Sequence, residues 1–209
     1  MPSHSRPLFE LHGPPLRRLR RCVIAAAAPQ CVWLVVAGGG TWSLRALLAL
    51  ICGLLLLVPF ARTGRRLHGS LAMPLVSGSL GGFGMLCGTL LDQYASGHVV
   101  PACHAALAHN FWPELNWMNG LMFAACVPGC LWLCPLCGSA YKRAFVHVTA
   151  ALCMFAGMTL GGLGLVQLAG DWSWARYSGS MHVAMLVGMM LGTLAVQLTL
   201  VPRPRPELA

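Results

Sequence analysis

Six long apolar runs constrain the fold of this chain more than any other feature. They occupy residues 22–40, 43–61, 70–91, 117–137, 144–168 and 181–201. Each run is close to the ~20 residues that a helix needs to cross ~30 Å of hydrocarbon. The chain is 57% hydrophobic and 9% charged, so a soluble fold could not cover its surface with polar groups. The runs also lack the alternation of a membrane barrel. The sequence therefore predicts an all-α, polytopic integral membrane bundle of about six transmembrane helices.

The basic residues fall almost entirely on one side of this predicted topology. Only Arg45 and Arg176 lie on the other side. Cytoplasmic segments carry the excess of Lys and Arg, so both termini are expected in the cytoplasm of a bacterial inner membrane. The twelve residues on the cytoplasmic side are Arg6, Arg17, Arg18, Arg20, Arg21, Arg62, Arg65, Arg66, Lys142, Arg143, Arg203 and Arg205. An aromatic belt at the outer boundary agrees, with Trp42, Trp112, Trp117, Trp172 and Trp174.

One transmembrane domain is expected. Residues 1–21 form a basic cytoplasmic segment, residues 22–201 form the bundle with an outer loop at 92–116, and residues 202–209 form a cytoplasmic tail. Pro29 interrupts the first run, which admits a signal peptide as the alternative. Retention is favoured because that proline lies inside the run and the second run follows at once.

A weak internal repeat predicts helix contacts. The sequences GMLCGTLLDQ at 84–93 and GMMLGTLAVQ at 188–197 share six identical positions, and GMTLGGL at 157–163 is a shorter copy. Glycines four residues apart let membrane helices approach closely, so we expect the third, fifth and sixth spans to pack together. The alternative is a duplicated metal-lining helix that carries Met85, Met158 and Met189.

The fourth run holds the densest group of sulfur atoms. From Met118 to Cys134 a sulfur-containing residue recurs at every fourth position. At about 100° per residue, these side chains form a stripe that covers a helical arc of about 160°. Its thioethers lie towards the outer side and its thiols towards the cytoplasm. Methionine binds monovalent copper without deprotonation, whereas thiolates need a reducing compartment. The candidate ligands in this stripe are Met118, Met122, Cys126, Cys130, Cys134 and Cys137.

Further donors lie near the outer side. Imidazole binds copper, zinc and nickel alike, so histidines near the outer side do not identify the metal. In the sixth span, methionines at helical spacing follow His182, for which Asp171 or the outer loop is the expected partner. Methionine also fills gaps in apolar cores, so packing is the alternative role. The candidate ligands outside the fourth run are His98, Cys103, His104, His109, His182, Met185 and Met189.

The Cys134–Cys137 pair has the C-x-x-C spacing of a redox motif. It resembles that of the quinone-linked thiol oxidases of the bacterial membrane, which are small helical bundles with this motif on the periplasmic side. The charge bias places the pair on the cytoplasmic side here. A zinc site would need a second such pair, which the sequence lacks. The chain has neither a Walker A nor a Rossmann glycine motif, which argues against nucleotide-driven pumping.

Three functions remain open from the sequence. The first is binding or transport of a soft transition metal such as copper(I) through Met, Cys and His ligands. The second is a non-catalytic subunit of a membrane complex, and the third is a thiol oxidoreductase that uses Cys134 and Cys137. In composition the chain is similar to predicted metal-binding integral membrane proteins of bacteria. We expect the lipid bilayer and either a metal ion or another membrane protein as partners, and no nucleic acid.

Overall fold

Each apolar run forms a helix. The computed structural model describes residues 10–11, 14–63, 67–68, 71–96, 117–133, 140–169 and 178–200. A two-residue antiparallel ladder joins β1 (Glu10–Leu11) to β2 (Leu67–His68). The helices are α1 (Pro14–Ala37), α2 (Trp42–Thr63), α3 (Ala72–Val76), the π-helical segment η2 (Ser77–Gly81), α4 (Gly82–Ser96), α6 (Trp117–Leu133), α7 (Ala140–Ala169) and α8 (Ser178–Leu200).

Five described spans are long and apolar enough to cross a membrane, and α3, η2 and α4 together form one of them. The other apolar helix, α6, has 17 described residues. Residues 134–137 of the expected fourth span lie outside the described part of the chain. The all-helical prediction is confirmed, and the five long spans fit a multi-pass membrane protein.

Helix α1 differs from the expected first span in two ways. It begins at Pro14, so it includes the arginines from Arg17 to Arg21, and it continues through Pro29. Proline cannot donate a backbone hydrogen bond, but neighbouring groups in a bundle compensate for such a loss. The helix ends at Ala37, three residues before the end of the expected first span. Gly39 and Gly40 then turn the chain into α2 with φ values of 78° and 79°, a conformation that glycine adopts without strain.

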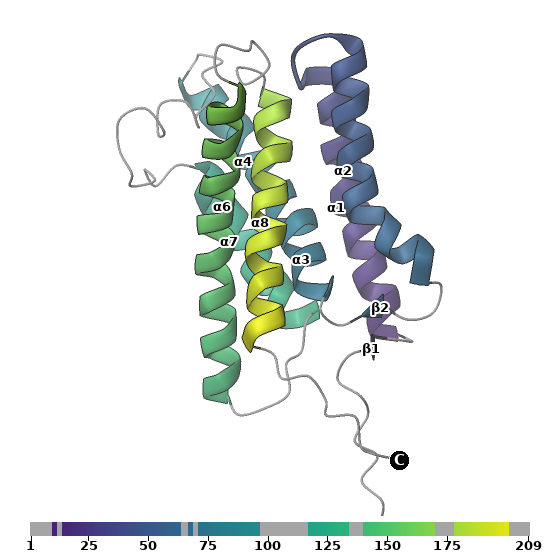
Figure 1. The fold of residues 1–209 in the computed structure, drawn as a ribbon, viewed down its shortest axis with the longest axis vertical. Coiled ribbons are helices and arrows are strands. Elements are labelled where there is room, and N and C mark those ends of the chain that lie inside the picture. Colours follow the sequence, from purple (N-terminus) through teal and green to yellow (C-terminus); the bar gives the residue numbers. More distant parts are fainter. Residues whose placement is uncertain are drawn as a thin grey trace, which may run out of the picture.

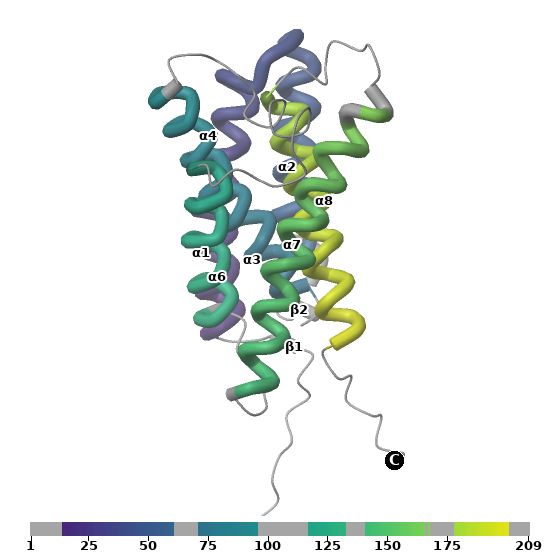
Figure 2. Tube along the Cα trace, turned by 90° about the vertical axis from the view of Figure 1, so that its left-hand side faces the viewer, coloured from purple at the N-terminus to yellow at the C-terminus, as the bar shows by residue number. Residues whose placement is uncertain are grey.

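The third span changes helix type at its centre. Segments of π-helix are rare and often lie at functional sites. Both views place α3 inside the bundle (Figure 1, Figure 2), and the side chains of the α3–η2 junction are buried. The Ser77 hydroxyl donates to the Pro74 carbonyl at 2.9 Å and lies 2.9 Å from the Thr193 hydroxyl of α8. These contacts place polar groups in the middle of an apolar bundle.

Glycines set the closest helix contacts. A Cβ atom added at Gly157 of α7 would overlap the Gly188 carbonyl oxygen of α8, and the reverse substitution would overlap that of Gly157. The expected packing of the fifth span on the sixth is therefore present. In the third span, Gly84 and Gly88 face the backbone of α6 instead, at Leu121 and Trp117–Met118. The third span meets α8 through α3 and η2.

The helix directions bring the basic helix ends together. α1 and α7 begin, and α8 ends, at the same end of the bundle, and α8 begins at the opposite end (Figure 1). Helix α1 carries its arginines in its first two turns, and α7 carries Lys142 and Arg143 in its first turn. Among the described residues, the basic side chains at the starts of α1 and α7 therefore gather at one end, whereas Arg45, in the first turn of α2, lies at the other end (Figure 1).

Candidate functional site

The described sulfur stripe of α6 faces the protein interior. Met118, Met122, Cys126 and Cys130 are all buried, with at most 6% of any side chain exposed. Cys134 and Cys137 lie outside the described residues. The inward orientation agrees equally with metal ligation and with apolar packing. The atoms that surround these side chains decide between the two roles.

The Met118 end of the stripe is occupied by helix packing. α6 packs mainly on α4 and η2, and a side chain at Gly88 would overlap the backbone of Met118. The metal hypothesis also predicts that the stripe meets Met185 or Met189 of α8. Both methionines are buried, and α8 packs mainly on α7 and α3, so this contact stays a prediction. A different methionine, Met154 of α7, lies next to the stripe.

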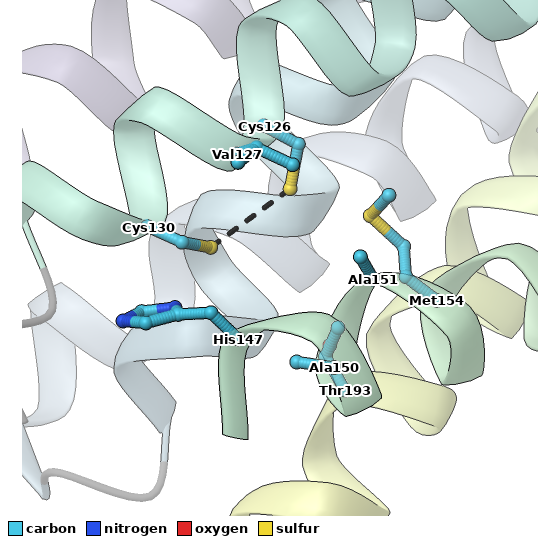
Figure 3. Close-up of a pocket in the computed structure, with 8 residues that line it drawn as sticks. All are labelled: Cys126, Val127, Cys130, His147, Ala150, Ala151, Met154 and Thr193. Carbon is cyan, nitrogen blue, oxygen red and sulfur yellow. Dashed lines mark hydrogen bonds between the residues drawn. The ribbon is translucent and has the colours of Figure 1, made fainter. Parts of the chain in front are cut away.

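A small cavity lies where α6 meets α7 and α8. Its volume is about 20 Å³, about the space of one water molecule. Figure 3 shows Cys126 and Cys130 on one wall, with His147 near Cys130 and Met154 on the other side of Cys126. The complete lining is Cys126, Val127, Cys130, His147, Ala150, Ala151, Met154 and Thr193.

Two thiols form the centre of this site. The Sγ atoms of Cys126 and Cys130 lie 3.9 Å apart, because residues four apart in a helix project from the same face. Gly81 of η2 leaves room beside them. A Cβ atom built at Gly81 would lie 3.7 Å from the Cys126 Sγ and 3.8 Å from the Met154 Sδ. The seven described cysteines form no disulfide with one another.

His147 adds a nitrogen donor that the sequence reasoning did not select. Its Nδ1 atom is buried and has no hydrogen-bond partner among the described residues. His147 and Met154 are seven residues apart, so they share one face of α7, and that spacing was the available signal. The Thr193 hydroxyl, in contrast, already donates within α8, to the Met189 carbonyl at 2.9 Å.

A second polar group surrounds His182 of α8. Its Nε2 atom lies 3.1 Å from the Gln30 Oε1 of α1, and its ring centroid lies 5.5 Å from that of Trp33. Gln30 is fully buried and also donates to the Ser79 carbonyl of η2 at 2.9 Å. The expected partner, Asp171, lies outside the described residues. The partner observed, Gln30, is an amide within the first apolar run, a feature that the sequence reasoning passed over.

Asp92 has a structural role. Its two carboxylate oxygens accept hydrogen bonds from the backbone N–H groups of Trp117, at 3.1 Å, and Met118, at 3.0 Å. These N–H groups at the start of α6 have no partner within the helix, and a carboxylate also complements the helix dipole there. From its position at the start of the outer loop, Asp92 is also a candidate oxygen donor in the sequence. The other members of that loop, His98, Cys103, His104 and His109, lie outside the described residues.

No three His, Cys, Asp or Glu side chains converge on one point within the described parts of the chain. The strongest donor group is therefore the thiol pair Cys126 and Cys130, with His147 and Met154 beside it. No protein-family model, curated protein or solved structure matches this chain.

Proposed function

We propose that this protein binds a soft transition-metal ion, copper(I) foremost, inside a bacterial inner membrane. Cys126 and Cys130 are the two sulfur ligands. The observation that carries the proposal is the 3.9 Å separation of their Sγ atoms beside a cavity. Thiolates are the ligands that select soft ions such as copper(I) over harder cations.

The sulfur separation also indicates the coordination number. Two metal–sulfur bonds of about 2.3 Å span 3.9 Å when the angle between them is about 115°. That angle is far from linear and falls between tetrahedral and trigonal-planar geometry, so the ion needs at least one more ligand. His147 supplies it, because its buried Nδ1 has no hydrogen-bond partner among the described residues and lies on the Cys130 side of the cavity (Figure 3). The imidazole ring must turn towards the sulfur pair when the ion binds.

The location in the bundle favours a reduced site. With the positive-inside orientation, α7 begins at the cytoplasmic surface, so His147 lies two turns into the membrane from that side. Cytosolic thiol pools keep cysteines reduced, and copper(I) is the reduced ion. Both termini in the cytoplasm and six crossings belong to this proposal.

Metal analysis of the purified chain tests the proposal. The protein is loaded anaerobically with copper(I) in detergent and desalted, and the ratio of copper to protein is measured. We expect Cys126→Ser/Cys130→Ser to bind one equivalent less than the unmodified chain. Cys22→Ser/Cys153→Ser is the matched control, because both residues are half-buried thiols that do not line the cavity. Equal copper content in all three proteins would contradict the proposal.

A further inference from the structure

The orientation of the Gln30 amide is fixed by its hydrogen bonds. Its Nε2 group donates to the Ala26 carbonyl at 3.0 Å and to the Ser79 carbonyl at 2.9 Å. Both amide hydrogens are therefore used, and the opposite assignment would turn the amide oxygen towards two carbonyl oxygens. The Oε1 atom must then be the one that faces His182, at 3.1 Å from its Nε2.

This arrangement determines which nitrogen of His182 carries the proton. The Gln30 Oε1 can only accept, so the His182 Nε2 must donate. In the neutral ring, Nδ1 is then the nitrogen with the lone pair. Histidines that bind metals typically donate their other ring N–H to an oxygen atom in this way, which fixes the tautomer and orients the ring.

Two methionines lie close to His182 in the sequence of α8. Met181 precedes His182 by one residue and Met185 follows it by three. At about 100° per residue, the three side chains occupy an arc of about 100° on one side of the helix. All three are buried, with exposed fractions of 3% for Met181, 5% for His182 and 6% for Met185. An imidazole nitrogen and two thioethers form a soft, uncharged donor set that needs no deprotonation to bind a cation.

We propose that His182 Nδ1, with the thioethers of Met181 and Met185, forms a second site for a soft monovalent cation, and that Gln30 is its positioning residue. The site is separate from the thiol pair. Thr193 lines the cavity of the thiol pair, and it lies eleven residues after His182, about 16 Å further along α8. The inference rests on the proposed function only for the class of ion, since its donor residues are different.

Silver(I) is a suitable probe because it is soft, monovalent and diamagnetic. The protein carries ¹³C-labelled methionine methyl groups, and spectra are recorded in detergent during a silver(I) titration. We expect the methyl resonances of Met181 and Met185 to shift together and saturate. The methyl resonance of Met158, which is equally buried on α7, should stay in place. Absence of a shift at Met181 and Met185 would overturn the inference.

Two variants test whether Met181, His182 and Met185 bind the ion or only pack together. His182→Gln should abolish the two methyl shifts. Gln30→Leu should weaken silver(I) binding at this site about 10- to 100-fold, because it removes the group that orients the imidazole. Methyl shifts that persist at unchanged affinity in both variants would overturn the inference.

A second readout covers the case in which either variant fails to fold. In the unmodified chain, ¹⁵N-labelled His182 should show the proton on Nε2 before silver(I) is added and a changed Nδ1 resonance afterwards. A proton on Nδ1 would contradict the inference.

The two proposals fail separately. In Cys126→Ser/Cys130→Ser, the methyl shifts of Met181 and Met185 should remain although the thiol site is lost. If the methyl shifts vanish in that variant, the second site is not independent and the inference is wrong. If the methyl shifts remain while copper content at the thiols is unchanged, only the proposed function is wrong.

Discussion

At the scale of single residues, the thiol pair carries no buried charge while both thiols are protonated. Isolated thiolates in an apolar environment are strongly disfavoured, so Cys126 and Cys130 need a cation to offset their charge. In the proposed site, binding a metal would release the two protons and place the cation between the two sulfur atoms. A copper(I) ion with two thiolates and a neutral imidazole carries one net negative charge. Arg143 lies one helical turn before His147 on α7 and supplies the nearest positive charge on that helix.

The choice between His147 and Met154 as the third ligand can be tested directly. His147→Ala should weaken copper(I) binding by more than about tenfold, since loss of a group that merely orients a ligand already costs 10- to 100-fold. Met154→Leu removes the thioether at nearly constant volume and should leave the affinity unchanged. Competition with a colorimetric copper(I) chelator measures both affinities. The opposite pattern, with Met154→Leu weakening binding and His147→Ala not, would assign the ligand to the thioether.

The carboxylate of Asp92 should contribute to stability and have no role in metal binding. Asp92→Ala leaves the N–H groups of Trp117 and Met118 without their acceptor, and loss of a helix-capping group costs about 0.5–2 kcal/mol. Reversible denaturation in mixed micelles measures the free energy of unfolding. Asp92→Asn retains one acceptor oxygen and should lose less. A decrease in bound copper without a decrease in stability would contradict this role.

At the scale of the elements, the α7–α8 contact depends on two glycines that face each other. Gly157 and Gly188 each lie against the carbonyl oxygen of the other, so neither position has room for a side chain. Without a hydrophobic driving force between helices in lipid, close backbone packing is the main source of their association. The repeated G-M-x-x-G pattern is therefore explained by helix packing at this contact.

Alanine at either glycine should destabilise the bundle. We expect Gly157→Ala and Gly188→Ala each to lower the free energy of unfolding by about 1–3 kcal/mol, the usual cost of overpacking. Gly164→Ala is the matched control on α7, because no atom lies within 4 Å of a Cβ added there. Its stability should equal or slightly exceed that of the unmodified chain, since alanine favours helices. Equal losses at Gly157 and Gly164 would show that the cost is not steric.

The sequence predicts well those elements that depend on whether the surrounding solvent is lipid or water. Long apolar runs specify helices, and the turn at Gly39–Gly40 follows from the run of glycines. The π-helical segment and the passage of α1 through Pro29 could not be predicted, because they depend on compensating contacts with other helices. The stripe on α6 is buried, as its periodicity allows, whereas its contact with Met185 or Met189 stays a prediction. Periodicity gives the face of a helix, and it does not say which helix lies opposite.

At the scale of the whole molecule, α8 and η2 connect the α1–α2 hairpin to the remaining helices. At the start of α8, the Gly179 N–H donates to the Gly38 carbonyl at 2.8 Å. Deeper in the bundle, Gln30 joins α1 to His182 and to η2. Polar groups and glycines both lie at this boundary, since a Cβ added at Gly82 would overlap the Gln30 side chain, whereas glycines facing backbone hold α7 to α8 and α4 to α6. The two kinds of contact place the His182 group at the boundary and the thiol pair among the packed helices.

The orientation of the molecule determines whether the thiol pair lies nearer a reducing or an oxidising compartment. An even number of crossings brings the start of α1 and the end of α8 to one end of the bundle, as the described helices are arranged (Figure 1). The positive-inside rule makes that end cytoplasmic, because α1 and α7 begin there with basic residues. A fluorescent protein fused after Ala209 should fluoresce, and alkaline phosphatase fused there should be inactive. Alkaline phosphatase fused after Ser96, where the described part of α4 ends, should be active, since this enzyme needs the oxidising side to form its disulfides. Phosphatase activity after Ala209 combined with inactivity after Ser96 would reverse the orientation. The thiol pair would then lie nearer an oxidising compartment, in which copper(I) binding through Cys126 and Cys130 could not be maintained.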